Sequence, residues 1–332
     1  MFFSGNEVIN DIKTSDTAPY IRAVTRDIKQ YVKKHSTRYI PVGYSAADVR
    51  EVLVDTWAYM QCSLTGDNTD DSIADLFALN SYSWCGGKAT FDTSGYDDLV
   101  GFFNKTSVPV FMSEYGCNEV KPRVFNEVQA LYGKEMTPYF SGGVVYEYTQ
   151  EENEYGLVKL EEDGNAKLLT DYDNFQMQLN KLDFSKLQST ASLVPEVPFP
   201  KCDKKLISNS KFPSNFTIPK PPADGLAKLI ETGIKNPYNG KIIDIADADL
   251  VVKQKVEQTD GSMLEGLAVK RLAGDSSNTP SGLTGGNGTT TDDASKTSGA
   301  GPAATSDSAA GSVQVGGLGL VMGAIFGALA MI

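Results

Sequence analysis

The first 148 residues alternate short apolar runs with segments of helical pattern, and this alternation limits the possible folds more than any other feature. The apolar runs predict strands over residues 1–7, 38–45, 75–84, 108–116 and 142–148. Helical patterns lie between them, over residues 17–35, 46–62, 96–103 and 122–132. Strands that alternate with helices favour a parallel α/β sheet, either open or closed into a barrel. Periodicity does not choose between these two forms.

Capping residues mark the starts of the first two predicted helices. Asp16, with Pro19 after it, is the predicted N-cap of the first helix. Ser45 is the predicted N-cap of the second, which would begin at Ala46. Asp and Ser are favoured there because their side-chain oxygens accept hydrogen bonds from the free N–H groups of the first turn.

The chain changes character after residue 150, and we divide it into four parts. Residues 1–150 carry the strand and helix alternation, and residues 151–270 contain a predicted strand pair, an irregular segment and two proline-rich stretches. We expect the second part to be an extension that packs on the first. Residues 271–312 are rich in Ser, Thr, Gly and Asp, with too few apolar groups to form a core, which predicts a flexible, O-glycosylated stalk. Residues 313–332 form an apolar tail.

The tail at residues 313–332 has the pattern of a GPI-attachment signal. Small residues precede the apolar run, and the run continues to the last residue. A membrane-spanning helix usually has basic residues on its cytoplasmic side, whereas the last basic residue here is Lys296, on the other side of the run. A tail-anchored helix and a buried helix are the alternatives, but glycines dilute the run. We therefore expect a GPI lipid anchor on the outer face of the cell membrane.

Attachment of a GPI anchor requires entry into the secretory pathway, which an N-terminal signal peptide provides. The first residues, MFFSGNE, have neither the basic start nor the apolar core of such a signal. We therefore expect that the N-terminal part of a longer protein is missing from this sequence.

Cysteines and glycosylation sequons agree with a secreted protein. Four cysteines in an oxidising compartment predict two disulfides, for which three pairings are possible. Three N-x-S/T sequons predict N-glycosylation. The cysteines are Cys62, Cys85, Cys117 and Cys202, and the sequons begin at Asn104, Asn215 and Asn287.

Charge and composition exclude several classes of partner. The net charge is −12 at pH 7, and nucleic-acid binding requires a basic face, so no nucleic acid is expected. The chain has one histidine and no CxxC pair, which argues against a zinc site. We expect neither a metal nor a cofactor. A neutral polymer is compatible with this composition.

Two glutamates lie at the C-terminal ends of predicted strands, Glu7 in the motif GNE and Glu114 in the motif SEYG. In a β/α barrel, catalytic groups gather at that edge. Retaining glycosidases use such a pair, one as the acid and the other as the nucleophile, with the carboxyl groups about 5–5.5 Å apart. Taken alone, each glutamate has an ordinary alternative as a surface residue.

Five separated motifs give the pair a more specific meaning. FFSGNEVIN, YIPVGYSAAD, NSYSWCG, VPVFMSEYGCN and SGGVVYEYTQEENEYGLV lie within about the first 205 residues. Together they resemble the fungal GPI-anchored β-1,3-glucanosyltransferases of glycoside hydrolase family 72, the Gas/Gel/Phr type. The resemblance implies a (β/α)8 TIM barrel in which residues 1–150 form strands four to eight, so that the first three strands are lacking. It also implies a cell-wall enzyme that cleaves β-1,3-glucan and transfers the new reducing end to another glucan chain.

The resemblance also implies roles for individual residues. Glu7 would be the general acid/base and Glu114 the nucleophile, while Asn6 would hydrogen-bond the sugar 2-hydroxyl. Tyr82 would orient Glu114, and Tyr146 would line the donor subsites. For both tyrosines the alternative is aromatic packing in the core.

Disulfide pairing and stacking surfaces follow from the same resemblance. It implies bridges Cys62–Cys202 and Cys85–Cys117, the second beside Glu114. Further aromatic residues that offer stacking faces for glucose rings are Trp84, Tyr115 and Tyr148. Besides a transferase, three readings remain open: a non-catalytic glucan-binding wall protein, an inactive fragment and a secreted endoglucanase, the last disfavoured by the anchor signal.

Overall fold

The computed structural model describes residues 1–183, 197–223, 225–235, 246–270 and 312–314. The chain divides into two compact units, Met1–Gly156 with Leu187–Lys241, and Leu157–Lys186 with Ile242–Ile332. Residues of the predicted extension are therefore found in both units. The predicted stalk and apolar tail lie almost entirely outside the described residues, as does the sequon at Asn287. The four predicted parts of the chain stay predictions.

A five-stranded parallel sheet forms the centre of the first unit, with its strands in the order β1-β2-β3-β4-β5. Consecutive strands are neighbours, as in a β/α barrel. The predicted parallel α/β sheet is confirmed. The strands are β1 (Phe2–Asn6), β2 (Val42–Ala47), β3 (Phe77–Asn80), β4 (Val110–Tyr115) and β5 (Phe140–Val145).

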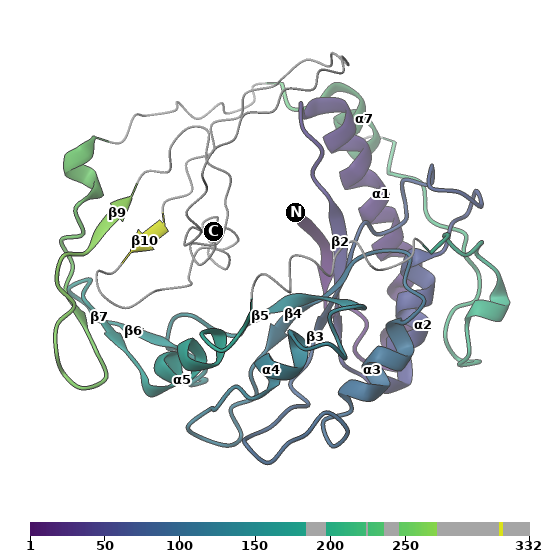
Figure 1. The fold of residues 1–332 in the computed structure, drawn as a ribbon. Helices are drawn as coiled ribbons and strands as arrows, with labels where there is room; N and C mark the ends of the chain where they lie inside the picture. The colour runs from purple at the N-terminus through teal and green to yellow at the C-terminus, as the bar shows by residue number, and fades with distance from the viewer. Residues whose placement is uncertain (184–196, 224, 236–245, 271–311, 315–332) are drawn as a thin grey trace, which may run out of the picture. The chain divides into compact units, whose positions relative to one another are not determined.

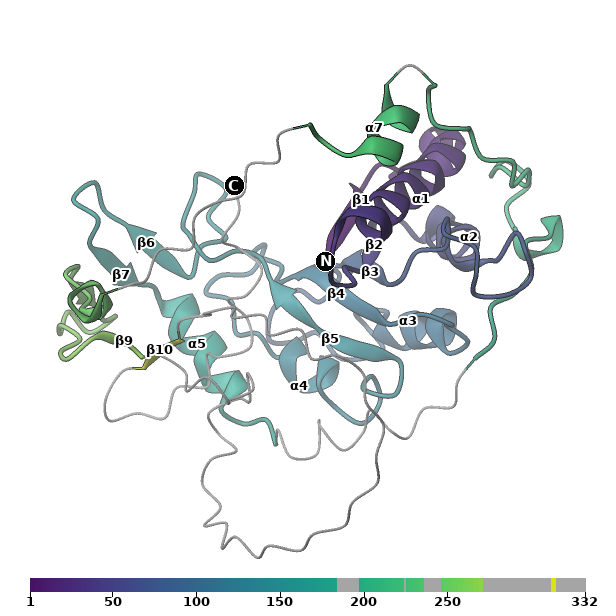
Figure 2. The ribbon, with the colours of Figure 1, turned by 90° about the horizontal axis from the view of Figure 1, so that it is seen from above.

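Helices connect these strands and lie on one side of the sheet (Figures 1 and 2). Strands β2 and β3 are buried at every residue, as expected for inner strands of a parallel sheet. The opposite ends of the sheet are the edge strands β1 and β5. The helices are α1 (Ala18–His35), α2 (Arg50–Gln61), α3 (Tyr96–Phe103) and α4 (Glu127–Leu131), with the 3-10 helix η1 (Ile12–Thr17) before α1.

Both predicted helix caps are wrong. The N-cap of α1 is Thr17, which makes no side-chain cap hydrogen bond, whereas Asp11 caps the preceding η1, where its side chain accepts a hydrogen bond from the Lys13 N–H at 2.8 Å. Ser45 lies inside β2, which continues through Ala47. The strand continues because its last two residues pair with β3, and helix α2 begins only at Arg50.

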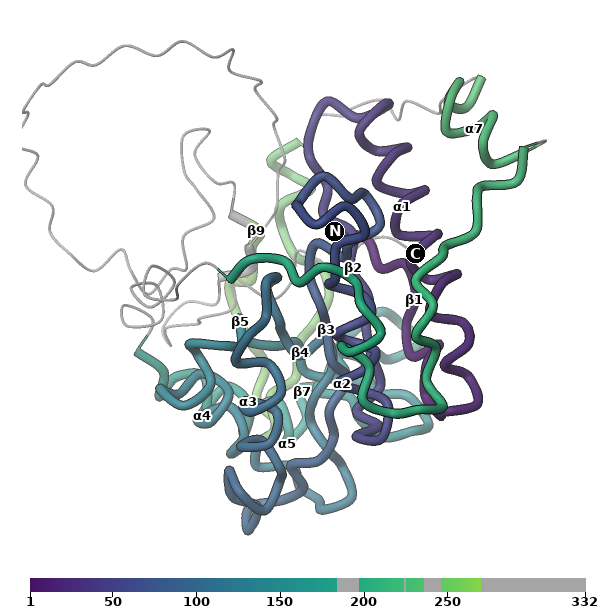
Figure 3. Tube along the Cα trace, turned by 90° about the vertical axis from the view of Figure 1, so that its right-hand side faces the viewer, coloured from purple at the N-terminus to yellow at the C-terminus, as the bar shows by residue number. Residues whose placement is uncertain are grey.

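The segment from Val197 onward is tied to helix α2 and then runs toward α1 (Figure 3). The Asp55 carboxylate accepts hydrogen bonds from the backbone N–H groups of Ser208 and Asn209, at 2.7 and 2.8 Å, and from the Ser208 hydroxyl at 2.9 Å. The ring of Phe216 stacks on Tyr59 with their centroids 4.7 Å apart. The segment contains the 3-10 helix η2 (Lys204–Leu206) and helix α7 (Leu226–Thr232), which packs against α1.

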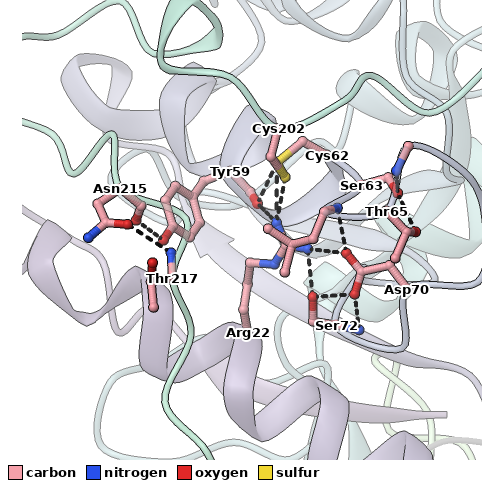
Figure 4. The surroundings of a disulfide bond; sticks show 12 residues. Arg22, Tyr59, Cys62, Ser63, Thr65, Asp70, Ser72, Cys202, Asn215 and Thr217 are labelled. Carbon is pink, nitrogen blue, oxygen red and sulfur yellow. Dashed lines mark hydrogen bonds and ion pairs between the residues drawn. A yellow bond between two sulfur atoms is a disulfide. The ribbon is translucent and has the colours of Figure 1, made fainter.

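A buried arginine lies beneath the disulfide that joins this segment to α2 (Figure 4). Arg22 is fully buried, and its guanidinium donates to the Tyr59 carbonyl at 2.9 Å and to both sulfurs of Cys62–Cys202 at 3.2 Å. Its other terminal nitrogen forms an ion pair with Asp70 at 3.0 Å. Burial lowers the pKa of Arg22, and Asp70 opposes that effect. Asp70 thus compensates the buried positive charge of Arg22 at the point where the segment is joined to α2.

The described residues of the second unit form short strands and the helix α5. Strands β6 (Val158–Leu160) and β7 (Ala166–Leu168) are antiparallel, which confirms the strand pair predicted there, and β8 (Val256–Glu257) pairs with β7. Helix α5 (Thr170–Leu179) replaces the irregular segment expected after the pair, because Phe175 and Leu179 share one face and are buried. The 3-10 helix η3 (Asp247–Leu250) and the antiparallel pair β9 (Ala268–Lys270) and β10 (Ser312–Gln314) complete this unit. Within the described residues, no helix has the length and apolar character needed to cross a membrane.

Candidate active site

The predicted site residues gather at the C-terminal edge of the parallel sheet. Asn6 is the last residue of β1 and Glu7 follows it, Glu114 lies near the end of β4, and Tyr146 follows β5. Tyr82 lies two residues beyond β3. Because parallel strands end at the same edge, residues far apart in sequence come together there.

Glu7 has an unusual backbone conformation. Its φ angle is +52°, in the left-handed region that few residues other than glycine adopt. Its N–H donates to the Ser45 carbonyl at 2.8 Å, which fixes the turn at the end of β1. Its carboxylate oxygen Oε1 accepts a hydrogen bond from Asn80 Nδ2 at 2.9 Å. The surrounding structure therefore holds both the backbone and the side chain of Glu7, and strained backbone of this kind is concentrated at functional sites.

Glu114 is partly buried and is hydrogen-bonded to Tyr82. The Tyr82 hydroxyl donates to Glu114 Oε2 at 2.6 Å. Burial raises the pKa of Glu114, the Tyr82 hydrogen bond opposes that rise, and the negative charges of Glu7 and Glu147 add to it. Burial and the bond to Glu114 also raise the pKa of Tyr82, so its hydroxyl stays a donor. The two glutamates are linked through β3, since Asn80 pairs with Glu114 in the sheet and donates to the Glu7 carboxylate.

Three tyrosines surround this hydrogen bond. Tyr82, Tyr146 and Tyr155 contact one another edge to face, with ring centroids 6.3, 5.7 and 5.3 Å apart in the three pairs. Buried Arg123 donates to the Tyr146 carbonyl at 2.7 Å and lies over the Tyr155 ring, 5.6 Å from its centroid. The cluster thus holds Tyr82 in the orientation from which it donates to Glu114.

Asn80 joins the two glutamate positions. It is the last residue of β3 and pairs with Glu114 in the adjacent strand. Its Nδ2 donates to Asn6 Oδ1 at 3.0 Å as well as to Glu7 Oε1. Its Oδ1 accepts from the hydroxyl of Ser113 at 2.6 Å and from that of Ser45 at 3.1 Å.

The second disulfide fixes the loops beside this edge. Cys85 and Cys117 are bonded, three residues beyond Tyr82 and Glu114 respectively. Both disulfides of the structure are the pairs that the family resemblance implies. Because these sulfurs are oxidised, Cys85 and Cys117 cannot serve as thiolate ligands with nearby Glu119.

The three aromatic residues predicted to stack on glucose differ in their exposure. Trp84 and Tyr115 are only 7% and 1% exposed, so both are core residues and the prediction that they stack on glucose is wrong. Tyr148 is 39% exposed, and its stacking on glucose stays a prediction. The sequence reasoning missed Tyr155 and Asn80, although both belong to motifs that carry the resemblance.

Comparisons with known proteins agree with this geometry. The family model for glucanosyltransferases of glycoside hydrolase family 72 matches residues 1–183. The chain belongs to this family. The matched region contains the whole five-stranded sheet and every residue of the site described above.

Relatives of this chain include 1,3-beta-glucanosyltransferase gel2 of Aspergillus fumigatus, 47% identical over 279 residues, which cover 84% of this chain and 57% of the relative. 1,3-beta-glucanosyltransferase GAS4 of Saccharomyces cerevisiae is 36% identical over 267 residues, 80% of this chain and 54% of the relative. The chain thus spans about half the length of the curated relatives it matches.

Solved structures of Saccharomyces cerevisiae Gas2p resemble this chain. The Gas2p complex with laminaripentaose has a TM-score of 0.56 and 35% identity, over 67% of this chain and 48% of Gas2p. A Gas2p variant with laminaritetraose and laminaripentaose has a TM-score of 0.51 and 40% identity, over 55% and 40%. The five parallel strands thus have the arrangement of strands in a TIM-barrel glucanosyltransferase.

Proposed function

We propose that this chain is part of a retaining β-1,3-glucanosyltransferase that cleaves β-1,3-glucan and transfers the new reducing end to another glucan chain during fungal cell-wall assembly. Family membership and the Gas2p complexes with laminari-oligosaccharides support the substrate class. The observation that carries the chemistry is the pairing of Glu7 and Glu114 at one sheet edge, each held by a hydrogen bond from strand β3 or the loop after it.

In the first half of the reaction, a Glu114 oxygen attacks the anomeric carbon of the donor glucan. The glycosidic C–O bond breaks, and the leaving oxygen takes the proton of Glu7. The donor remains bound to Glu114 as a glycosyl ester, and the fragment on the reducing side departs. This step requires an ionised Glu114, and the Tyr82 hydrogen bond favours that form.

In the second half, Glu7 acts as the general base. The acceptor's terminal 3-hydroxyl gives its proton to Glu7, and its oxygen attacks the anomeric carbon, so that the bond to Glu114 breaks and a new β-1,3 linkage forms. Water in place of the acceptor would give hydrolysis. Asn6 has its Oδ1 occupied by Asn80, which leaves its Nδ2 to donate to the sugar 2-hydroxyl. Tyr146 lies beside Tyr82 and would line the donor subsites.

Product length tests this function. Incubation of the protein with reduced laminari-oligosaccharides should give products longer than the substrate, measured by chromatography or mass spectrometry. Shorter products alone would identify a hydrolase. Binding without any product would identify a non-catalytic glucan-binding protein or an inactive fragment.

Two variants separate the carboxylate roles. Glu114→Gln should abolish turnover of every donor, because no glycosyl ester can form. Glu7→Gln should still react with a donor that has a good leaving group, and should then stall until azide, which needs no general base, is added. Undiminished transfer of unactivated glucan by Glu7→Gln would contradict its role as the acid/base.

We further propose that the protein is held on the outer face of the plasma membrane by a GPI anchor and acts in the cell wall. The apolar tail over residues 313–332 supports this localisation. Deletion of that tail should release the protein into the medium, as an immunoblot of cell and medium fractions would reveal. Continued membrane retention would contradict the proposed anchor.

N-glycosylation at Asn104, Asn215 and Asn287 is part of the same proposal. Asn104 and Asn215 are exposed in the structure, which is compatible with an attached glycan. Peptide mapping after enzymatic deglycosylation in heavy-oxygen water would identify each occupied asparagine. An unmodified asparagine at every sequon would contradict this part of the proposal.

A further inference from the structure

Asn80 has hydrogen-bonding partners at both ends of its carboxamide. It is only 3% exposed. Nδ2 carries two hydrogens and donates to two oxygens, Glu7 Oε1 and Asn6 Oδ1. Oδ1 has two lone pairs and two hydroxyl neighbours, Ser45 and Ser113. A buried amide with partners at both ends in this way has one fixed orientation.

The two serines determine which end of the amide faces Glu7. Their hydroxyl oxygens are 2.8 Å apart and form a polar triangle with Asn80 Oδ1, in which two hydroxyl hydrogens serve three contacts and at least one serine donates to Oδ1. A rotation of the amide by 180° would place Oδ1 against the Glu7 carboxylate, oxygen to oxygen. The triangle therefore keeps the donor Nδ2, and not the acceptor Oδ1, against Glu7.

This orientation has a consequence for the proton of Glu7. Oε1 receives a hydrogen from Asn80, and an amide nitrogen cannot accept one in return. When Glu7 is protonated, its proton therefore belongs on Oε2. We propose that Asn80 is a positioning residue that keeps the Glu7 proton on Oε2 for transfer to the leaving oxygen, and that keeps Asn6 Nδ2 available to the sugar. This inference rests on the proposed function and assigns a role to a residue that acts on the substrate only through Glu7 and Asn6.

Asn80 also connects the site across the sheet. Ser113, which donates to its Oδ1, directly precedes Glu114 in β4, and the Glu114 carbonyl accepts from the Ser81 N–H at 2.9 Å. The same residue of β3 thus positions side chains at the ends of β1 and β4. The charged and titratable groups that interact with Glu7 are Glu114 on β4 and Tyr44 on β2, whose hydroxyl accepts from the Ile9 N–H.

Asn80→Asp tests the proposal, because it preserves shape and replaces the donor with a second carboxyl oxygen facing Glu7. Two facing carboxyls share a proton, so the shared proton is no longer directed to the leaving oxygen. We expect kcat on unactivated laminari-oligosaccharides to fall by about 100-fold or more, with a smaller change in KM. The alkaline limb of the pH profile should move to higher pH by about one unit. A donor with a good leaving group should show a smaller loss.

Gln61→Glu is the matched control. Gln61 is 3% exposed, lies on α2, and uses its Oε1 to accept from the Ser107 N–H at 3.1 Å. This change also introduces a carboxyl for a buried amide, so it should lower the melting temperature. It should leave the pH profile of the active enzyme unchanged. A pH profile that shifts equally in both variants would overturn the proposal, because that result would reflect general loss of stability.

A titration keeps the inference separate from the proposed activity. Carbon-13 NMR of glutamate-labelled protein, with the Glu7 carboxyl assigned by its absence in Glu7→Gln, follows Glu7 without any substrate. Its titration midpoint should move to higher pH in Asn80→Asp. If the Glu7 midpoint does not move in Asn80→Asp, this inference alone is wrong. If the midpoint moves but the wild-type protein has no transferase activity, the proposed function alone is wrong.

Ser113→Ala is a second variant for the case in which Asn80→Asp does not fold. It removes the 2.6 Å hydrogen bond that orients the amide and preserves the volume of the strand almost completely. We expect a loss in kcat of about tenfold with KM little changed, since the amide can then rotate. Full activity in a folded Ser113→Ala protein would overturn the proposed orienting role.

Discussion

Removal of one hydroxyl, in Tyr82→Phe, should change the pH range in which this site works. The hydroxyl donates to Glu114 Oε2 at 2.6 Å and opposes the rise in pKa that burial imposes on Glu114. A hydrogen bond to a charged group contributes about 1.5–3 kcal/mol, and one pKa unit corresponds to about 1.4 kcal/mol. The pKa of Glu114 should therefore rise by about one to two units in the variant.

The direction of the effect follows from the proposed role of Glu114 as the nucleophile. The nucleophile acts in its ionised form, so activity is lost as the pH falls through its pKa. A higher pKa moves the acidic limb of the pH profile to higher pH, by about one to two units. Initial rates of oligosaccharide elongation between about pH 3 and pH 8, expressed as kcat/KM, would measure the limb.

Tyr59→Phe provides the matched control for this experiment. The Tyr59 hydroxyl donates to the Asn215 carbonyl at 2.7 Å, in the segment that packs on α2. This variant also loses one tyrosine hydroxyl bond and should be less stable, but its acidic limb should coincide with that of the wild type. An acidic limb in Tyr82→Phe that stays in place or moves to lower pH would refute the reasoning.

Three further predictions concern stability. Burial raises the pKa of Glu127 to about 7 from 4.5, so the folded state binds this proton more tightly than the unfolded state, and the free energy of unfolding should fall by about 3 kcal/mol as the pH rises from 4.5 to 8. Urea unfolding of Glu127→Gln should show no such fall. An equal fall in the variant and the wild type would contradict the prediction. Replacement of Cys62 and Cys202 by alanine removes a bridge with a sequence separation of 140 and should lower the free energy of unfolding by up to about 5 kcal/mol. Removal of Cys85–Cys117, which closes a shorter loop, should lower it by less, and thermal unfolding of both variants would measure the difference. Asp55→Ala should cost about 3 kcal/mol and expose residues 197–218 to limited proteolysis, and a wild-type cleavage pattern would count against it.

The sequence predicted the sheet well because each strand is a compact apolar run. Strand β2 extends beyond its run, through Ala46 and Ala47, because pairing with β3 outweighs the helical propensity of alanine. Helix α5 was missed because its apolar face is narrow and lies within a polar stretch. The error at the end of β2 therefore has a tertiary cause, because its pairing partner β3 lies about 30 residues further along the chain.

The candidate site was predictable where the residue type and its motif indicate a catalytic role. Glutamates at strand ends and a tyrosine in a family motif are such signals, and Glu7, Glu114 and Tyr82 come together in the structure. Asn80 gave no such signal, because a buried asparagine acquires its role only from the strands beside it. The β3–β4 register, which shifts between Leu79 and Asn80, is a tertiary property that local pattern does not encode.

The attachment of residues 197–218 to helix α2 affects how the protein folds during synthesis. Asp55 is only 2% exposed, and its backbone hydrogen-bond donors follow it by 153 and 154 residues. At about 5–20 residues per second, the ribosome needs roughly 8–30 s to make that intervening chain. During this interval the nascent sheet carries a carboxylate without its native partners and a helix face not yet covered. The first unit therefore completes its fold only after β5, the last strand of its parallel sheet, has left the ribosome.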